Sequence, residues 1–203
     1  MYPYKSTKEE NEARKEHDYY STPSDTTQAL LNVLKPVMYP KLDVILEPAC
    51  GEGKMSRVMR ENGYKVSSSD AYEYEYKPAT YNLDFLKMDA TSCSWIITNP
   101  PFNLAEEFIR KAATISRPET FRGYAMLLKS NYWHAKSREP LFQDYTPSLV
   151  LPLTWRPKFN ETQKAPVLDM AWNVWLDEPD MRDELVTYAA DSAFYIPLLK
   201  PEK

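Results

Sequence analysis

The chain has 203 residues, of which 43% are hydrophobic and 13% are aromatic, and this length and composition predict one globular domain with a full hydrophobic core. Lys and Arg number 25 against 29 Asp and Glu, which gives a net charge of −4 and argues against a protein that coats nucleic acid through its overall charge. A nucleic-acid substrate would therefore need a local basic patch. The two cysteines and two histidines lack the spacing of a disulfide framework or a metal site, so we expect no metal.

The longest apolar runs and the N-terminal residues indicate where in the cell the protein is located. No apolar run approaches the roughly 18 residues that a membrane span needs, and the charged N-terminal residues lack the apolar segment of a signal peptide. We therefore expect a soluble, cytoplasmic protein with no membrane partner. Residues 1–17 carry mixed charge and little apolar material, which predicts a charged N-terminal arm before a single domain at 18–203.

Helical and strand patterns alternate along the chain. Ser21 and Thr22 before Pro23 form an N-cap signal. The expected helices lie at 23–36, 55–62 and 104–112, and the expected strands lie at 44–46, 64–70, 82–86, 94–98, 124–128, 149–153 and 170–176. This alternation predicts an α/β, Rossmann-like fold with a mostly parallel, twisted sheet, helices on both faces and an antiparallel strand at the edge. The ligand of such a fold lies at the carboxyl ends of the strands.

A glycine pair follows the first expected strand, in the segment 47–53 (EPACGEG). Glycine at such a turn lets the backbone approach a ligand, and the start of the next helix presents free N–H groups to it. The third glycine position of the full dinucleotide fingerprint holds Ser56. Asp70 comes nineteen residues after Gly51, at the end of the second strand, where a carboxylate can accept both ribose hydroxyls of a nucleoside. The alternative for the glycines alone is an ordinary strand-to-helix turn.

The tetrapeptide 99–102 (NPPF) directly follows a buried strand. Two successive prolines remove two backbone donors and hold Pro100 extended, which leaves its carbonyl free to point outward. The carboxamide oxygen of Asn99 and this carbonyl then converge on one point, where an exocyclic amine satisfies both with its two hydrogens. Drawing those hydrogens out of the base plane localises the nitrogen lone pair and makes the amine nucleophilic without a charged base. Phe102 offers a face on which the heterocycle can stack.

Taken together, these segments resemble the class I S-adenosylmethionine (SAM) dependent methyltransferases, and within them the amino-methyltransferases that modify adenine N6 in DNA. The matched segments, in the family order over residues 18–102, are 18–23 (DYYSTP), 47–53, Asp70, 84–86 (DFL) and 99–102. Looser similarity at 151–159 and 169–175 resembles the tail of small phage or prophage adenine methyltransferases.

The resemblance implies a SAM cofactor and a DNA substrate whose adenine is flipped into the site. It assigns Tyr20 and Thr22 to the methionine part of SAM, Glu47, Ala49 and Gly51 to the floor beneath it, Asp70 to the ribose, and Asp84 and Phe85 to the cofactor's adenine. It assigns Asn99, Pro100, Pro101 and Phe102 to the flipped target base. Cys50 departs from the family, where a small residue is usual, and we interpret it as a packed side chain and not as a nucleophile.

The loop from Trp155 to Phe159 is the candidate DNA contact. Its two aromatic residues flank Arg156 and Lys158, so it combines rings for stacking with charges for phosphates. The alternative is a pair of exposed charges beside core aromatics. A separate target-recognition domain is missing from the pattern, so sequence specificity would be short, relaxed or supplied by a second subunit, and assembly as a homo-oligomer stays open.

Other functions also stay open from the sequence. Adenine in RNA and the amide nitrogen of a protein glutamine present the same two hydrogens to Asn99. A SAM-binding protein that sequesters or degrades the cofactor, or blocks a host nuclease system, would need the glycine motif but not the segment 99–102, so an intact tetrapeptide counts against it.

Overall fold

The computed structural model describes residues 20–74, 76–159, 165–178, 180–183, 185 and 201, and the arm expected at 1–17 lies outside them. The helices are α2 (Ser24–Leu34), α3 (Lys54–Glu61), α4 (Ala105–Thr114) and α5 (Glu139–Asp144), with 3₁₀ turns η1 (Phe85–Lys87), η2 (Phe102–Leu104), η3 (Tyr132–His134) and η4 (Lys136–Arg138). The strands are β1 (Val44–Glu47), β2 (Lys65–Ser69), β3 (Ala79–Thr80), β4 (Trp95–Thr98), β5 (Gly123–Lys129), β6 (Leu149–Pro152) and β7 (Met170–Leu176). No helix in these ranges has the length and apolar character needed to cross a membrane.

One sheet joins these strands in the order β3-β2-β1-β4-β5-β7-β6. β1 pairs in parallel with β2 and β4, and the pairs β2–β3 and β4–β5 are also parallel. β7 runs antiparallel to both β5 and β6. The expected Rossmann-like sheet with an antiparallel edge is therefore confirmed. The strand order reverses between β1 and β4, which opens a crevice at their carboxyl ends.

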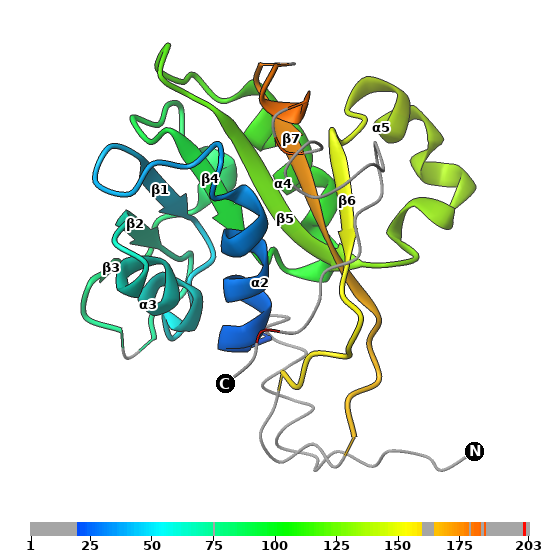
Figure 1. Ribbon diagram of the computed structural model, residues 1–203, viewed down its shortest axis with the longest axis horizontal. Helices are drawn as coiled ribbons and strands as arrows, with labels where there is room; N and C mark the ends of the chain where they lie inside the picture. Colours follow the sequence, from blue (N-terminus) through cyan, green and yellow to red (C-terminus); the bar gives the residue numbers. More distant parts are fainter. Residues whose placement is uncertain are drawn as a thin grey trace.

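Each central strand contributes alternate side chains to two hydrophobic cores. Ile45, Trp95 and Ile97 pack with residues of α2 and α3 on one face, whereas Leu46 and Ile96 pack with residues of α4 on the other, because successive side chains of a strand point to opposite faces. Figure 1 shows α2 and α3 in front of the sheet and α4 behind it. Since both faces are covered, a ligand reaches the sheet at the ends of its strands.

The prediction of a strand at 82–86 is wrong. The chain forms the short strand β3 before this segment and the 3₁₀ turn η1 at its end. Asp84 caps that turn, since its carboxylate accepts a hydrogen bond from the backbone N–H of Leu86 at 3.0 Å. Phe85 is buried, with its ring centroid 5.1 Å from that of Phe108. A local cap and the burial of one ring thus outweigh the alternating pattern.

Sequence patterns do not predict α5. This helix has six residues, with a proline in its first turn, and six residues are too few for a helical period of apolar positions to show. The three expected helices are confirmed within one or two residues at each end.

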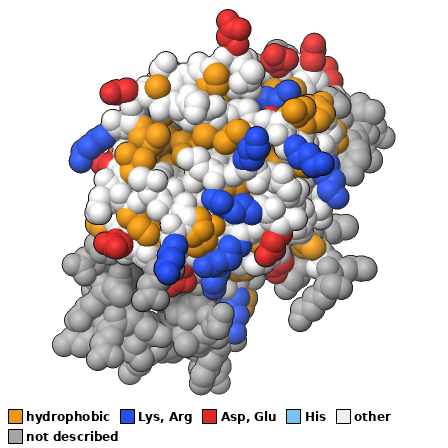
Figure 2. All heavy atoms as spheres, turned by 90° about the vertical axis from the view of Figure 1, so that its left-hand side faces the viewer, with side chains coloured by type: hydrophobic (Ala, Val, Ile, Leu, Met, Phe, Trp, Pro, Cys, Tyr) orange, Lys and Arg blue, Asp and Glu red, His pale blue; other side chains and the backbone are white. Residues whose placement is uncertain are grey.

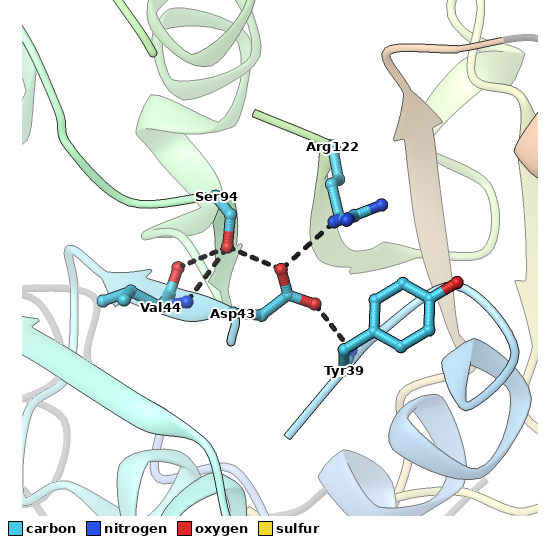
Figure 3. Close-up of polar contacts among 5 residues, drawn as sticks. All are labelled: Tyr39, Asp43, Val44, Ser94 and Arg122. Carbon is cyan, nitrogen blue, oxygen red and sulfur yellow. Dashed lines mark hydrogen bonds and ion pairs between the residues drawn. The ribbon is translucent and has the colours of Figure 1, made fainter. Parts of the chain in front are cut away.

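At the amino ends of the strands, a buried carboxylate ties three strand starts together (Figure 3). Asp43, directly before β1, is 2% exposed. It accepts hydrogen bonds from the Tyr39 backbone N–H at 2.6 Å, the Ser94 hydroxyl at 3.0 Å and the Arg122 Nε at 3.2 Å. Ser94 and Arg122 directly precede β4 and β5. These contacts fix the amino edge of the sheet, and the carboxyl edge is left for a site.

Candidate functional site

A pocket lies at the carboxyl ends of β1, β2 and β4. Glu47, Asp70 and Asn99 end or directly follow these strands, and all three line it. The predicted site residues in its lining are Tyr20, Thr22, Glu47, Ala49, Asp70, Asp84, Phe85, Asn99, Pro100 and Pro101. The fold brings these distant segments together because parallel strands end at one edge of the sheet.

The glycine turn holds Asp70 in place. Gly51 has a φ of 48° and Gly53 a φ of 72°, both in the left-handed region that favours glycine. The backbone N–H of Gly51 donates to the Asp70 carboxylate at 2.8 Å, and the N–H of Tyr72 donates to it at 3.0 Å. A Cβ on Gly53 would lie 2.3 Å from the ring of Tyr76. Gly51 thus acts on the pocket through Asp70 and is not among its lining residues.

Glu47 ends β1 inside the pocket and is 1% exposed. The hydroxyl of Ser56 donates a hydrogen bond to its carboxylate, so the residue that replaces the third fingerprint glycine supports this acid. Burial raises the pKa of Glu47 to about 8, and the Ser56 hydrogen bond opposes that rise. Glu47 is therefore largely protonated at neutral pH in the protein without ligand.

Asp84 and Phe85 reach the pocket through η1. The carboxylate of Asp84 keeps its capping bond to Leu86 and also pairs with the exposed Lys87 at 3.2 Å. Phe85 is 1% exposed and forms part of the core behind the pocket. A carboxylate beside a buried ring suits a flat heterocycle that carries an exocyclic donor.

Asn99 leaves one polar atom without a partner. Its Nδ2 lies 3.2 Å from the backbone oxygen of Tyr20 and 3.0 Å from the hydroxyl oxygen of Thr22. Its Oδ1 is buried and accepts no hydrogen bond in the structure. Because buried polar atoms are nearly always hydrogen-bonded, this oxygen is a candidate acceptor for a donor on a bound ligand. Pro100, the next residue, lines the same pocket.

Phe102 does not line the pocket with the rest of its motif. Its ring centroid lies 4.6 Å from that of Tyr20, and the Nζ of Lys129 also lies 4.6 Å from its centroid. Tyr20 in turn meets Phe159 edge to face, with centroids 5.7 Å apart. A base that stacks on Phe102 therefore has to share its ring with Tyr20 and Lys129 or displace one of them.

The loop 155–159 places its charges outside and its rings inward. Arg156 and Lys158 are exposed, and Arg156 pairs with Asp169 at 2.8 Å. Phe159 is 8% exposed, while Trp155 is half-buried with an indole N–H that has no partner. The loop reaches the pocket through the contact of Phe159 with Tyr20, and none of its residues is in the pocket lining.

Sequence reasoning missed several lining residues. Tyr72 and Tyr74 follow Asp70 in the loop after β2, and Lys54 begins α3. The others are Ser21, Pro48, Cys50, Met55, Ala71, Leu86, Leu104 and Phe108. Two tyrosines at alternate positions after a strand-ending acid are a usable signal for aromatic walls. The apolar members carry no signal apart from the ordinary core pattern.

The thiol of Cys50 is an inert member of the lining. Cys50 is 5% exposed, and burial raises the pKa of its thiol, so it stays protonated and is a poor nucleophile. In the parts of the chain that the structure describes, no group of three or more His, Cys, Asp and Glu residues could hold a metal ion.

Neither a protein-family model nor a curated protein matches this sequence, but solved structures share its fold. A protein described as a candidate RNA methyltransferase from Pyrococcus horikoshii matches with a TM-score of 0.58 and 16% identity, over 77% of this chain and 84% of that one. The modification subunit of a candidate type I restriction enzyme from Vibrio vulnificus matches with 0.55 and 14%, over 83% and 47%. A candidate class I SAM-dependent methyltransferase from Listeria monocytogenes matches with 0.55 and 12%, over 88% and 65%.

At identities this low, the structural matches establish a shared fold alone. The sheet of this chain has the mostly parallel order, the antiparallel edge pair and the helices on both faces described above. The chain has the Rossmann-like fold of the class I SAM-dependent methyltransferases.

Proposed function

We propose that this chain is a SAM-dependent methyltransferase that acts on the exocyclic N6 amine of adenine in DNA. The observation that carries the proposal is the buried, unpartnered Oδ1 of Asn99 in one pocket with the buried carboxyl groups of Glu47 and Asp70. An amine with two hydrogens supplies the donor that the Asn99 oxygen lacks, and Asp70 beside it is a candidate acceptor for the ribose hydroxyls of a nucleoside.

The residues after β1 and β2 fit SAM. Asp70 is 7% exposed, and its two oxygens accept bonds from the backbone N–H groups of Gly51 and Tyr72. A carboxylate oxygen can accept more than one hydrogen bond, so Asp70 is the candidate acceptor for the ribose hydroxyls. Asp84 and Phe85 are the candidates for the adenine ring. When bound, SAM supplies an electrophilic methyl group on a positively charged sulfur.

Asn99 and Pro100 fit the amine that would accept the methyl group. The Oδ1 of Asn99 takes one amine hydrogen, and the carbonyl of Pro100 is the candidate acceptor for the other. Two acceptors outside the base plane localise the nitrogen lone pair toward the methyl carbon. The amine nitrogen would bond to the methyl carbon as the carbon–sulfur bond breaks, with S-adenosylhomocysteine as the neutral leaving group. The nitrogen would then release one proton to solvent, so this chain needs no ionised base at the site.

A nucleic-acid acceptor is supported by the surface charge. Figure 2 shows Lys and Arg side chains gathered across the middle of the face on the side of β2, β3 and α3, with Asp and Glu mostly toward its edges. Exposed basic residues of these elements include Arg57 and Lys65. This is the kind of local basic surface that a protein of net charge −4 needs to approach phosphates. Arg156 and Lys158 add exposed charge near the aromatic cluster around Tyr20.

The descriptions of two proteins of similar fold also concern nucleic acid: a candidate RNA methyltransferase and the modification subunit of a candidate restriction enzyme. The second of these favours DNA. The first makes adenine in RNA the second candidate acceptor, because the amine and its two hydrogens are the same.

The acceptor is tested by incubating the purified chain with isotopically labelled SAM and adenine-containing DNA or RNA. Mass spectrometry of the digested nucleosides is expected to find labelled N6-methyldeoxyadenosine from the DNA. Labelled N6-methyladenosine from the RNA alone would move the acceptor to RNA. If neither nucleoside carries the label and a glutamine of an added protein does, the methyl acceptor is a protein and not a nucleic acid.

The chemistry is tested with Asn99→Ala. We expect calorimetry to give a SAM affinity within about twofold of the parent, whereas single-turnover methylation falls roughly a hundredfold or more, as on removal of one preorganised hydrogen-bonding group. Asn32→Ala in α2, outside the pocket lining, is the matched control and keeps the parental rate. Methylation by Asn99→Ala at the parental rate would contradict the role of Asn99 as an acceptor for the substrate amine.

A further inference from the structure

The segment before α2 fixes the orientation of the Asn99 amide. The Nδ2 of Asn99 lies 3.2 Å from the backbone oxygen of Tyr20 and 3.0 Å from the hydroxyl oxygen of Thr22. A backbone carbonyl can only accept a hydrogen bond, so the amide atom that faces Tyr20 must be the nitrogen. The oxygen of the amide therefore points away from Tyr20, and it is this oxygen that has no partner.

Thr22 is available for this contact because it does not cap α2. The N-cap of α2 is Pro23, and no side chain makes a capping hydrogen bond there, although Ser21 and Thr22 form a capping signal in the sequence. Thr22 is 4% exposed and lines the pocket. Its buried hydroxyl accepts the hydrogen bond from Asn99 across 77 residues of sequence.

Because the buried Oδ1 of Asn99 has no partner, no hydrogen bond on the oxygen side holds the amide in this orientation. Rotation by half a turn would exchange its oxygen and nitrogen, and the nitrogen would then face an incoming amine with hydrogen against hydrogen. In that orientation the oxygen would also face the carbonyl oxygen of Tyr20 and the hydroxyl of Thr22. The carbonyl of Tyr20, which can only accept, therefore opposes the rotation that would abolish the acceptor function, and the Thr22 hydroxyl anchors the amide nitrogen beside it.

We infer that Thr22 is a positioning residue, whose hydroxyl, together with the carbonyl of Tyr20, holds the Asn99 amide with its oxygen toward the substrate amine. This inference rests on the proposed function and goes beyond the contact with SAM that the family resemblance implies for Thr22. A residue that only binds SAM would affect cofactor affinity. A residue that orients Asn99 affects the rate of transfer when SAM is already saturating.

Three variants separate these roles. Thr22→Val removes the acceptor and keeps the shape of the side chain, whereas Thr22→Ser keeps the hydroxyl. Thr27→Val is the matched control, because Thr27 is 0% exposed in α2, outside the pocket lining, and its hydroxyl has no partner. Thermal unfolding of all three shows whether each variant folds.

At saturating SAM, we expect the single-turnover rate of Thr22→Val to fall roughly tenfold or more. Thr22→Ser restores most of that rate, and Thr27→Val keeps the parental rate. A variant Thr22→Val that binds SAM more weakly but turns over at the parental rate when saturated would overturn the inference and leave Thr22 as a cofactor contact alone.

The hydrogen bond itself is tested without turnover. The side-chain amide signals of Asn99 in a ¹H–¹⁵N NMR spectrum are identified by their loss in Asn99→Ala. We expect these signals to shift in Thr22→Val and to stay in place in Thr27→Val. Unmoved signals in Thr22→Val would overturn the inference. If the parent transfers no methyl group, the proposed function fails by that result, and the NMR comparison still decides the contact between Asn99 and Thr22.

Discussion

The two carboxyl groups at the ends of the neighbouring strands β1 and β2 are held in different ways. Asp70 accepts hydrogen bonds from two backbone N–H groups of the glycine turn and the following loop. Glu47 is more deeply buried and has the hydroxyl of Ser56 as a donor. Burial penalises the ionised form of Glu47 and raises its pKa.

The raised pKa of Glu47 predicts a pH dependence of stability. The pKa of Glu47 rises from 4.5 to about 8 on folding, so the folded chain holds one more proton than the unfolded chain between these values. The stabilising contribution of the protonated acid is therefore fully present below about pH 4.5 and is lost as the pH rises through 8. Glu47→Gln, which keeps an acceptor for Ser56 and cannot ionise, should lose this dependence.

The measurement is urea unfolding of both proteins from pH 5 to pH 8.5. We expect the stability of the parent relative to Glu47→Gln to fall with rising pH by on the order of a few kcal/mol. A constant difference between the two proteins across this range would mean that Glu47 is ionised in the folded chain at all of these pH values.

At the scale of the elements, the amino ends and the carboxyl ends of the strands differ in their contacts. Asp43 joins the starts of β1, β4 and β5 through Ser94 and Arg122, whereas the other ends of β1, β2 and β4 open into the pocket. At the amino edge the buried carboxylate has three hydrogen-bond donors, whereas the carboxyl edge carries the unpartnered oxygen of Asn99. A change at the amino edge is therefore expected to affect stability and not binding.

Asp43→Ala tests this division. Its loss leaves three donors without their shared buried acceptor, and we expect destabilisation by roughly 3 kcal/mol. Arg122→Ala should cost less, about 1 kcal/mol or below, because the Arg122 side chain is 36% exposed and water can replace it. Urea unfolding gives both costs, and calorimetry of the folded variants should show unchanged SAM affinity. An equal cost for the two variants would place the stabilisation in the ion pair alone.

At the scale of the whole molecule, the net charge of −4 opposes the approach of DNA, whereas the local basic surfaces favour it. Arg156 pairs with Asp169, and both side chains are more than half exposed. Such an exposed pair contributes little stability, so Arg156 can exchange Asp169 for a phosphate at small cost. Lys158 is exposed in the same loop.

The salt dependence of DNA binding measures these contacts. If Arg156 and Lys158 each contact one phosphate, changing both to Ala should reduce the slope of log affinity against log salt by up to about 2. Lys158→Ala alone should reduce it by about 1, while the control Lys35→Ala, at the end of α2, leaves it unchanged. An unchanged slope in the double variant would place the DNA surface elsewhere, with the exposed Arg57 and Lys65 as the next candidates.

The sequence by itself determined the layered architecture. Apolar runs at 44–46, 94–98 and 124–128 are long enough to be buried on both faces, and helical patterns between them demand parallel crossovers. The order of strand ends then brought Glu47, Asp70 and Asn99 to one edge, because the topology of such a sheet leaves little freedom.

Tertiary structure alone decided how the side chains of the site are used. A capping signal before α2 predicts a local role for Thr22, yet its hydroxyl meets Asn99, 77 residues away. The ring of Phe102 is likewise flanked by Tyr20 and Lys129, and Asp84 caps a turn where the pattern predicts a strand. Periodicity and turn residues report burial and local backbone geometry. They carry no information on which distant donor meets which acceptor, because that choice is made only when the elements pack.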